Sequence, residues 1–264
     1  MNFSRYATLL AAILLPVLLP AAVIGPDSFG YTARSNTDPG GIPLAFSTIA
    51  GTGSLLLTGD DNVTSVTLGS SFGFYGSSYS SVTVSTNGNL QFASSKANYS
   101  NTALTASGFG PTIFAFWDDL QFGGAGQGVF YQYFASGVHP NLSGPTSVFE
   151  WTGGYYQNFA STTVRVQALL EHNTGRILTQ YQNSTTRGTG TSATIGIQNG
   201  SGTSLEWLFD GTGQLVPSQS TILFSAVPET QSLVLVSSGL SMAILWRRRR
   251  ARSLAANINL LEAE

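Results

Sequence analysis

The chain has 264 residues, of which 42% are hydrophobic and only 9% charged, and its formal net charge is −2. Residues 27–227 carry five basic and ten acidic side chains, so they lack the clustered lysines and arginines that bind phosphate, and we expect no nucleic-acid partner. No cysteine occurs, which excludes disulfides and thiolate metal sites.

The N-terminus is an uncharged run rich in leucine and alanine. It covers residues 6–24 and follows Arg5, an arrangement typical of a secretory signal peptide. Pro16 and Pro20 interrupt a regular helical span, which favours a signal peptide over a permanent anchor. We therefore predict a signal peptide at residues 1–25 and export of the chain.

Residues 26–226 consist mainly of short β-branched or aromatic runs separated by turn residues. They predict nine strands, at residues 63–68, 82–86, 113–116, 129–134, 148–151, 162–170, 177–181, 193–197 and 222–224. Along the strand at 162–170, polarity alternates with period two, which predicts one buried face and one partly wet face. Residues 94–111 and 137–145 lack this pattern and are expected to be loops.

Two turns in this segment predict hairpins. Asn87-Gly88 favours a two-residue type I′ turn, in which both residues have positive φ, and residues 173–175 favour a second hairpin. No helix is expected between the signal peptide and residue 230. Short strands without crossover helices predict one all-β domain, a β-sandwich at residues 26–226, with a closed barrel as the alternative.

Five segments of this domain, taken in order, carry a family resemblance. They are FGFYGSSYSSVTVSTNGNLQF (72–92), IFAFWDDL (113–120), VFEW (148–151), VQALLEHNTGRILTQYQN (166–183) and ATIGIQNGSG (193–202). Their succession resembles the nidogen-like extracellular β-domain of bacterial secreted proteins over most of residues 30–224. The resemblance implies an adhesion-like extracellular module and supplies no catalytic residues.

Acidic residues offer the strongest hint of catalysis. Asp118 and Asp119 follow a predicted strand, and Asp60 and Asp61 form a second pair. A glycosidase needs two carboxylates in one cleft, for which Asp118 or Asp119 would have to meet Glu150 or Glu171. Neighbours on a strand point to opposite faces, so we instead expect the aspartates to cap backbone amides at a strand end, with Trp117 packed below. A calcium site is an intermediate alternative.

The two histidines, His139 and His172, lie in predicted turns and are expected to be solvated, without a serine elbow nearby. We therefore predict no enzyme activity, no catalytic residues, no cofactor and no metal site.

Aromatic residues could form a platform for sugars or simply pack in the core. The candidates are Phe72, Phe74, Tyr75, Tyr79, Tyr131, Tyr133, Tyr155 and Tyr156. Among them Tyr155-Tyr156 is the preferred ligand contact, because neighbouring strand residues face opposite ways and one of the two must face outward.

The C-terminus combines a short motif, an apolar run and a basic block. Val227, Pro228 and Glu229 precede residues 230–246, which carry no charge and would span roughly 25 Å as a helix, just enough to cross a bilayer. The basic block is Arg247, Arg248, Arg249 and Arg250, a stop-transfer signal that stays in the cytoplasm. We expect this helix to anchor the chain in the cytoplasmic membrane, with residues 253–264 as a short cytoplasmic tail.

This order resembles the PEP-CTERM sorting signal that exosortases process in bacteria, over residues 227–252. Pro228 and Glu229 match the first two motif positions, whereas Thr230 stands where the family usually has a second proline. The resemblance implies an exosortase-type processing partner and release of the domain to the surface or matrix.

Together these features predict a non-enzymatic protein of the cell envelope or extracellular matrix, with exopolysaccharide as a candidate partner. The alternatives are a carbohydrate-binding or adhesive surface module and, in another class, a secreted hydrolase.

Overall fold

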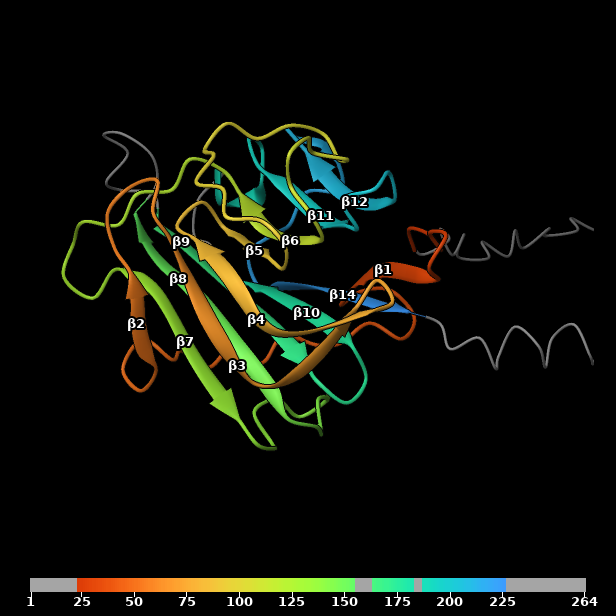
Figure 1. Cartoon of the computed structure of the whole chain (residues 1–264), viewed down its shortest axis with the longest axis horizontal. Coiled ribbons are helices and arrows are strands. Elements are labelled where there is room, and N and C mark those ends of the chain that lie inside the picture. Colours follow the sequence, from red (N-terminus) through yellow and green to blue (C-terminus); the bar gives the residue numbers. More distant parts are fainter. Residues whose placement is uncertain (1–22, 155–162, 183–186, 227–264) are drawn as a thin grey trace, which may run out of the picture.

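The chain forms two seven-stranded antiparallel sheets packed face to face, as Figure 1 shows for the computed structural model. The structure describes residues 23–154, 163–182 and 187–226. This architecture confirms the predicted all-β sandwich. The predicted signal peptide, apart from its last three residues, and the predicted C-terminal helix lie outside the described residues. Within the part of the chain that is described, no helix has the length and apolar character needed to span a membrane.

In spatial order, the first sheet contains β1 (Tyr31–Ser35), β14 (Ser220–Ala226), β10 (Arg176–Tyr181), β9 (Thr163–Glu171), β8 (Thr146–Gly154), β7 (Gly128–Phe134) and β2 (Ser54–Leu57). The second contains β13 (Thr212–Gly213), β12 (Ser204–Phe209), β11 (Thr194–Gln198), β6 (Thr112–Trp117), β5 (Asn89–Gln91), β4 (Ser77–Ser85) and β3 (Val63–Phe74). A single 3₁₀ turn at Arg187–Thr189 is the only helical element among the described residues.

The core lies between the two sheets, where alternate side chains of each strand meet. From the first sheet it takes Phe149, Trp151, Val164, Val166, Ala168, Leu170, Ile177, Ile222 and Phe224, and from the second Val82, Val84, Leu90, Ile113, Ala115, Ile195, Ile197 and Trp207. Buried aliphatic and aromatic area of this kind is the main driving force for folding. Since the chain has no cysteine, this buried apolar area stabilises the fold without disulfide bonds.

The turn at Asn87-Gly88 differs from its prediction. Ser85 pairs with Asn89, so the loop has three residues, Thr86 to Gly88, and among them only Gly88 has a positive φ, of 73°. The type I′ prediction was therefore wrong in its geometry, although the hairpin exists. The second hairpin is confirmed, because Arg176 pairs with Glu171 across the predicted turn.

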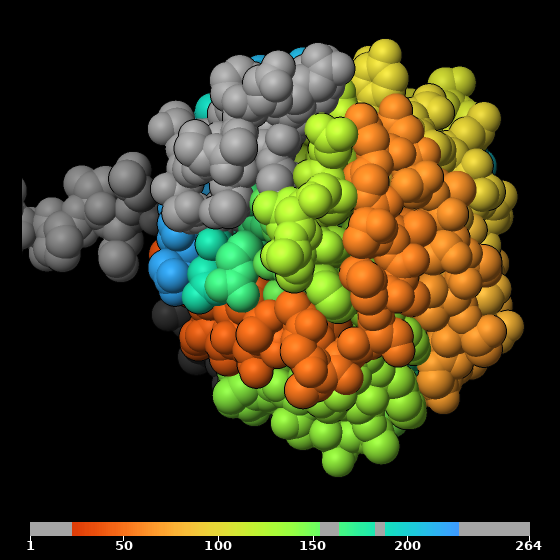
Figure 2. Space-filling model, turned by 90° about the vertical axis from the view of Figure 1, so that its left-hand side faces the viewer, coloured from red at the N-terminus to blue at the C-terminus, as the bar shows by residue number. Residues whose placement is uncertain are grey.

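The outer face of the first sheet is covered rather than partly wet. A row of polar side chains crosses four neighbouring strands in register and is completely or almost completely buried: Glu150, Gln167, Gln180 and Thr221. Residues 36–53, which we call the strap, lie over this row, and Figure 2 shows the orange-red segment crossing the surface beside the green and teal strands.

Hydrogen bonds tie the strap to the polar row. The backbone N–H of Ala45 donates to Gln180 Oε1 (2.9 Å), and that of Ile49 donates to Glu150 Oε2 (2.7 Å). Gln167 Nε2 donates to the carbonyl of Ser47 at 2.7 Å. The period-two pattern located the polar side chains correctly, but their burial depends on a distant segment that the pattern does not contain.

The outer face of the second sheet is covered in the same way, by residues 92–111. This segment is irregular, as predicted for residues 94–111, but Ala106 and Phe109 are buried against Phe114 and Trp117. Phe114 and Trp117 share the outer face because the register between β6 and β11 shifts, which breaks the strict alternation of the strand.

Candidate functional site

The two aspartate pairs singled out in the sequence lie near one another at one end of the second sheet. β6 ends at Trp117, which is buried, and Asp118 Oδ1 accepts a hydrogen bond from the backbone N–H of Asp119 at 2.9 Å. Asp118 Oδ2 accepts a second one from Ser192 Oγ at 2.7 Å. The expected strand-end cap is therefore confirmed for Asp118 but not for Asp119, and both carboxylate oxygens of Asp118 accept hydrogen bonds from protein donors.

Asp119 points instead toward the turn before β3. Carboxylate oxygens of Asp60, Asp61 and Asp119 lie within 4.8 Å of one another, and we call these three residues the acidic cluster. Asp61 has a positive φ of 50°, and its Oδ1 accepts a hydrogen bond from Asn87 Nδ2 at 2.7 Å. The Asn87 side chain thereby fixes the position of one carboxylate, while its own Oδ1 receives the N–H of Leu120 at 3.0 Å.

Partial burial and, to a smaller extent, the proximity of like charges change the ionisation of the acidic cluster. Partial burial raises the pKa of Asp119 to about 6, with smaller contributions from the negative charges of Asp60, Asp61 and Asp118. Desolvation followed by the charge of Asp61 also raises the pKa of Asp60. Ionised together, the three carboxylates repel one another. Their oxygens are of the kind that hard cations such as calcium prefer, so a divalent cation is the ligand class these residues could hold.

Glu150 and Glu171 are too deeply buried to face Asp118 or Asp119 across an open cleft, as the glycosidase hypothesis requires. Glu150 is buried beneath the strap, where it accepts hydrogen bonds from the N–H of Ile49 and from Gln167. Glu171 is also buried and pairs with Arg176 at 2.7 Å. Burial opposes ionisation of Glu171, but hydrogen bonds led by that of Arg176 outweigh it, so its pKa is lowered. Both glutamates serve backbone and side-chain donors of the fold.

The histidines are not the solvated turn residues that the sequence predicted. His139 is only 3% exposed, its Nδ1 accepts the N–H of Asn141 at 3.1 Å, and burial lowers its pKa. His172 is half-buried, and desolvation lowers its pKa too. Its Nε2 lies 2.9 Å from Ser147 Oγ, and its Nδ1 lies 3.1 Å from the carbonyl of Ser71. The predictions failed because the segments that cover these side chains are distant in sequence.

The contact between Ser147 and His172 is a serine–histidine pair that the sequence did not reveal. Ser147 is fully buried, and the group that orients the imidazole is a backbone carbonyl rather than a carboxylate. A nucleophilic serine must be reachable by substrate and its histidine is normally oriented by an acid. This pair therefore has the geometry of a structural contact that joins β3 to β8 and the turn after β9.

Most of the candidate aromatic platform packs inside the sandwich. Phe72, Phe74 and Tyr75 are buried, and Tyr79 and Tyr131 pack partly buried against the core. The alternative that Phe72, Phe74 and Tyr75 form a sugar-stacking platform is therefore wrong. The preferred contact residues, Tyr155 and Tyr156, lie outside the described residues, as do the sorting residues Val227, Pro228 and Glu229 and the arginines at 247–250. Their predicted roles stay predictions.

Comparison with known families supports the resemblance found for the central domain. The family described as NIDO related matches residues 41–234. This range includes most of both sheets, most of the strap and the whole acidic cluster. No curated protein and no solved structure gives a significant match. Because the family match spans well over half of the sequence, the chain belongs to the NIDO-related family.

Proposed function

We propose that this protein is an exported, non-enzymatic component of the cell envelope or extracellular matrix, with its β-sandwich outside the cytoplasmic membrane. Membership in the NIDO-related family, which indicates an extracellular module, is the observation that carries the proposal. The signal-peptide pattern at residues 1–25 supports the same direction of transport.

Sorting depends on the C-terminal signal in this proposal. β14, the last strand that the structure describes, ends at Ala226, directly before Val227, where the PEP-CTERM-like motif begins. The apolar segment 230–246 then crosses the membrane, and the four arginines at 247–250 hold it there. An exosortase-type enzyme cuts near Pro228-Glu229, which releases the sandwich with all of its described strands.

The burial and hydrogen bonding of the acidic residues support the proposal that the protein is not an enzyme. Asp118, Glu150 and Glu171 each accept hydrogen bonds from the fold, and the two glutamates are fully buried. A catalytic carboxylate must reach substrate or water. The acidic cluster at Asp60, Asp61 and Asp119 is accessible, but its carboxylates share one small volume rather than facing each other across a cleft.

The test is a mass measurement of the mature protein combined with fractionation of the native host. We expect the sandwich outside the cytoplasmic membrane, without residues 1–25, and with a C-terminus near Glu229. The variant Pro228→Ala should retain the unprocessed C-terminus, whereas the control Glu262→Gln in the predicted tail should be processed normally. A wild-type protein that stays in the cytoplasm would disprove export, and a full C-terminus in the wild type would disprove processing.

A further inference from the structure

A small pocket opens at the edge of the sandwich, where the two sheets separate. Its walls come from the end of β1, the start of β14, the strand β12 and the segment after β13, so residues distant in sequence enclose one space. Its volume is about 160 Å³. That is roughly five times the share of one water molecule in the liquid, and about half the lower limit for sites of drug-sized ligands.

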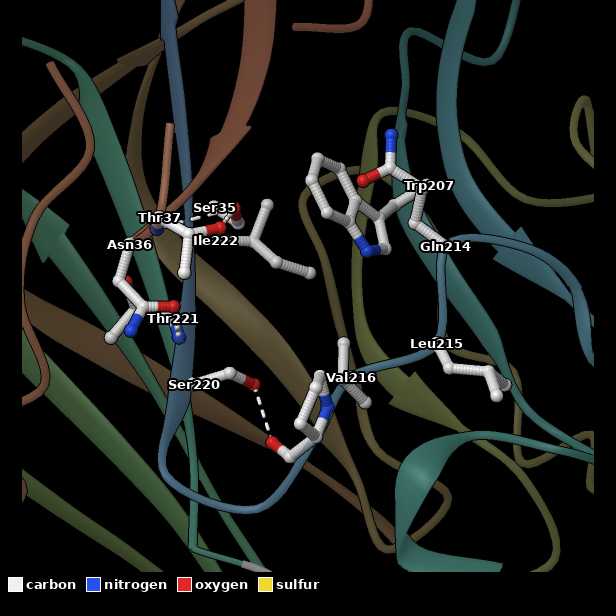
Figure 3. A pocket seen from close by; sticks show the side chains of 11 residues that line it. Ser35, Asn36, Thr37, Trp207, Gln214, Leu215, Val216, Ser220, Thr221 and Ile222 are labelled. Carbon is white, nitrogen blue, oxygen red and sulfur yellow. Dashed lines mark hydrogen bonds between the residues drawn. The ribbon is translucent and has the colours of Figure 1, made fainter. Parts of the chain in front are cut away.

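The indole of Trp207 projects into this pocket, as Figure 3 shows. Trp207 is 3% exposed, and its Nε1 is buried without a hydrogen-bond partner in the described structure. By contrast, the indoles of Trp117 and Trp151 donate to the carbonyls of Asn98 and Ser85, each at 2.8 Å. A buried N–H is nearly always paired, because leaving it unpaired costs free energy. The orphan donor therefore points to an acceptor that the described residues do not supply.

The lining restricts the chemistry of that acceptor. Val216 and Ile222 contribute apolar walls to the pocket, while Ser35, Asn36 and Ser220 contribute hydroxyl and amide groups. None of the described residues that line the pocket is charged. A charged ligand would lose its hydration without a counter-charge, so a neutral ligand is favoured. A flat ring with C–H groups on its faces and hydroxyls on its edge fits both kinds of wall.

We propose that this pocket binds one ring of a neutral sugar, with a ring hydroxyl or the ring oxygen accepting the hydrogen bond of Trp207 Nε1–H. The pocket accommodates a single residue at the end of a glycan, and Leu215, 46% exposed at its rim, is placed to contact what is attached to that residue. The proposal gives a ligand class to the non-enzymatic module proposed above. Export and C-terminal processing are measured separately, so either proposal can fail without the other.

Selective ¹⁵N labelling of tryptophan tests the proposal directly. The full chain has four tryptophans and therefore four indole N–H signals, which Trp→Phe substitutions assign. The protein is prepared in a detergent without a sugar headgroup and titrated with glucose, galactose, mannose and N-acetylglucosamine. At least one of these should shift the Trp207 signal saturably, with a Kd on the order of 1–10 mM, while Trp117 and Trp151 shift little. Glucuronate and glucosamine, which are charged, should bind more weakly.

Trp207→Phe is the decisive variant because it keeps an aromatic ring but removes the N–H. Saturation-transfer signals from the bound sugar should show affinity reduced about five- to tenfold, the effect of losing one hydrogen bond. Trp117→Phe is the matched control, since it removes the same group on the outer face of the same sheet and should leave sugar affinity unchanged. If no neutral sugar shifts the Trp207 signal saturably at 100 mM, or if Trp207→Phe binds as the wild type does, the proposal is wrong and the pocket holds only water.

Discussion

The acidic cluster predicts an unusual result, that removing a charge from Asp119 stabilises the folded protein at neutral pH. The pKa of the Asp119 carboxyl rises from 3.8 to about 6 on folding, and this lowers the unfolding free energy of the protein by at most ~3 kcal/mol once the pH exceeds both values. Asp119 is partly exposed, so solvent screening reduces this to ~1 kcal/mol. For a domain of this size, Asp119→Asn should therefore raise the Tm by about 2–4 °C at pH 7.5.

The pH dependence gives this prediction its sign. The folded-state pKa of Asp119 is raised, so its contribution to stability is fully present below pH ~4 and is lost as the pH rises through about 6. The difference between variant and wild type should consequently vanish near pH 4. Thermal unfolding followed by circular dichroism measures both values, and Asp60→Asn should produce part of the same effect. A Tm for Asp119→Asn that is equal to or below the wild-type value at pH 7.5 would refute the repulsion argument.

Three further predictions concern the buried polar groups. Glu150→Ala should lower the unfolding free energy by about 3–5 kcal/mol, because it leaves buried donors of the strap and of β9 without an acceptor. Arg165→Ala should lower it by less than ~1 kcal/mol, since the Arg165 side chain is 36% exposed and its Nη2 lies 3.9 Å from Glu150 Oε1. Urea unfolding measures both values. Trp117→Phe should be about 1 kcal/mol less stable than Trp207→Phe in the same assay, because only the former loses an indole hydrogen bond. The lowered pKa of Glu171 contributes stability that is fully present above its ordinary pKa of 4.5 and is lost as the pH falls from there through the folded-state pKa. Between pH 5 and pH 3, the Tm of Glu171→Gln should therefore fall less than the Tm of the wild type.

The sequence was sufficient for the strands with dense β-branched and aromatic content. All nine predicted strands exist, and the structure extends most of them; β3, for example, continues from the predicted end at residue 68 to Phe74. Some of the missed strands are short or atypical: β1 contains an arginine and two small polar residues, and β13 has two residues. The conformation of these two depends on pairing with a neighbour, β14 for β1 and β12 for β13, which local sequence does not encode. The six-residue strand β12 (SLEWLF) was missed as well, although its apolar and aromatic content is typical of a strand.

The sites were harder to predict because each depends on contacts between distant segments. Asp60 and Asp119 were each noted in the sequence, but only the packing of the turn before β3 against the end of β6 brings them together. Trp207 carries no local sign of its role, since its orphan N–H follows from the separation of the sheets at their edge. The buried glutamines and glutamate of the outer face resembled exposed polar residues until the strap covered them.

The path of the chain links the proposed pocket to the proposed anchor. β1 and β14 are antiparallel neighbours in which Tyr31 pairs with Ala226 and Ser35 pairs with Ile222 (Figure 1). Ala226 is the last residue before the proposed sorting motif, so in the proposed arrangement the end of the strand pair at Tyr31 and Ala226 would face the membrane. Ser35 and Ile222 line the pocket at the other end, four residues or about 13 Å further along the strands. A sandwich held by its C-terminal helix would thus direct the pocket away from the membrane, where surface glycans can reach it.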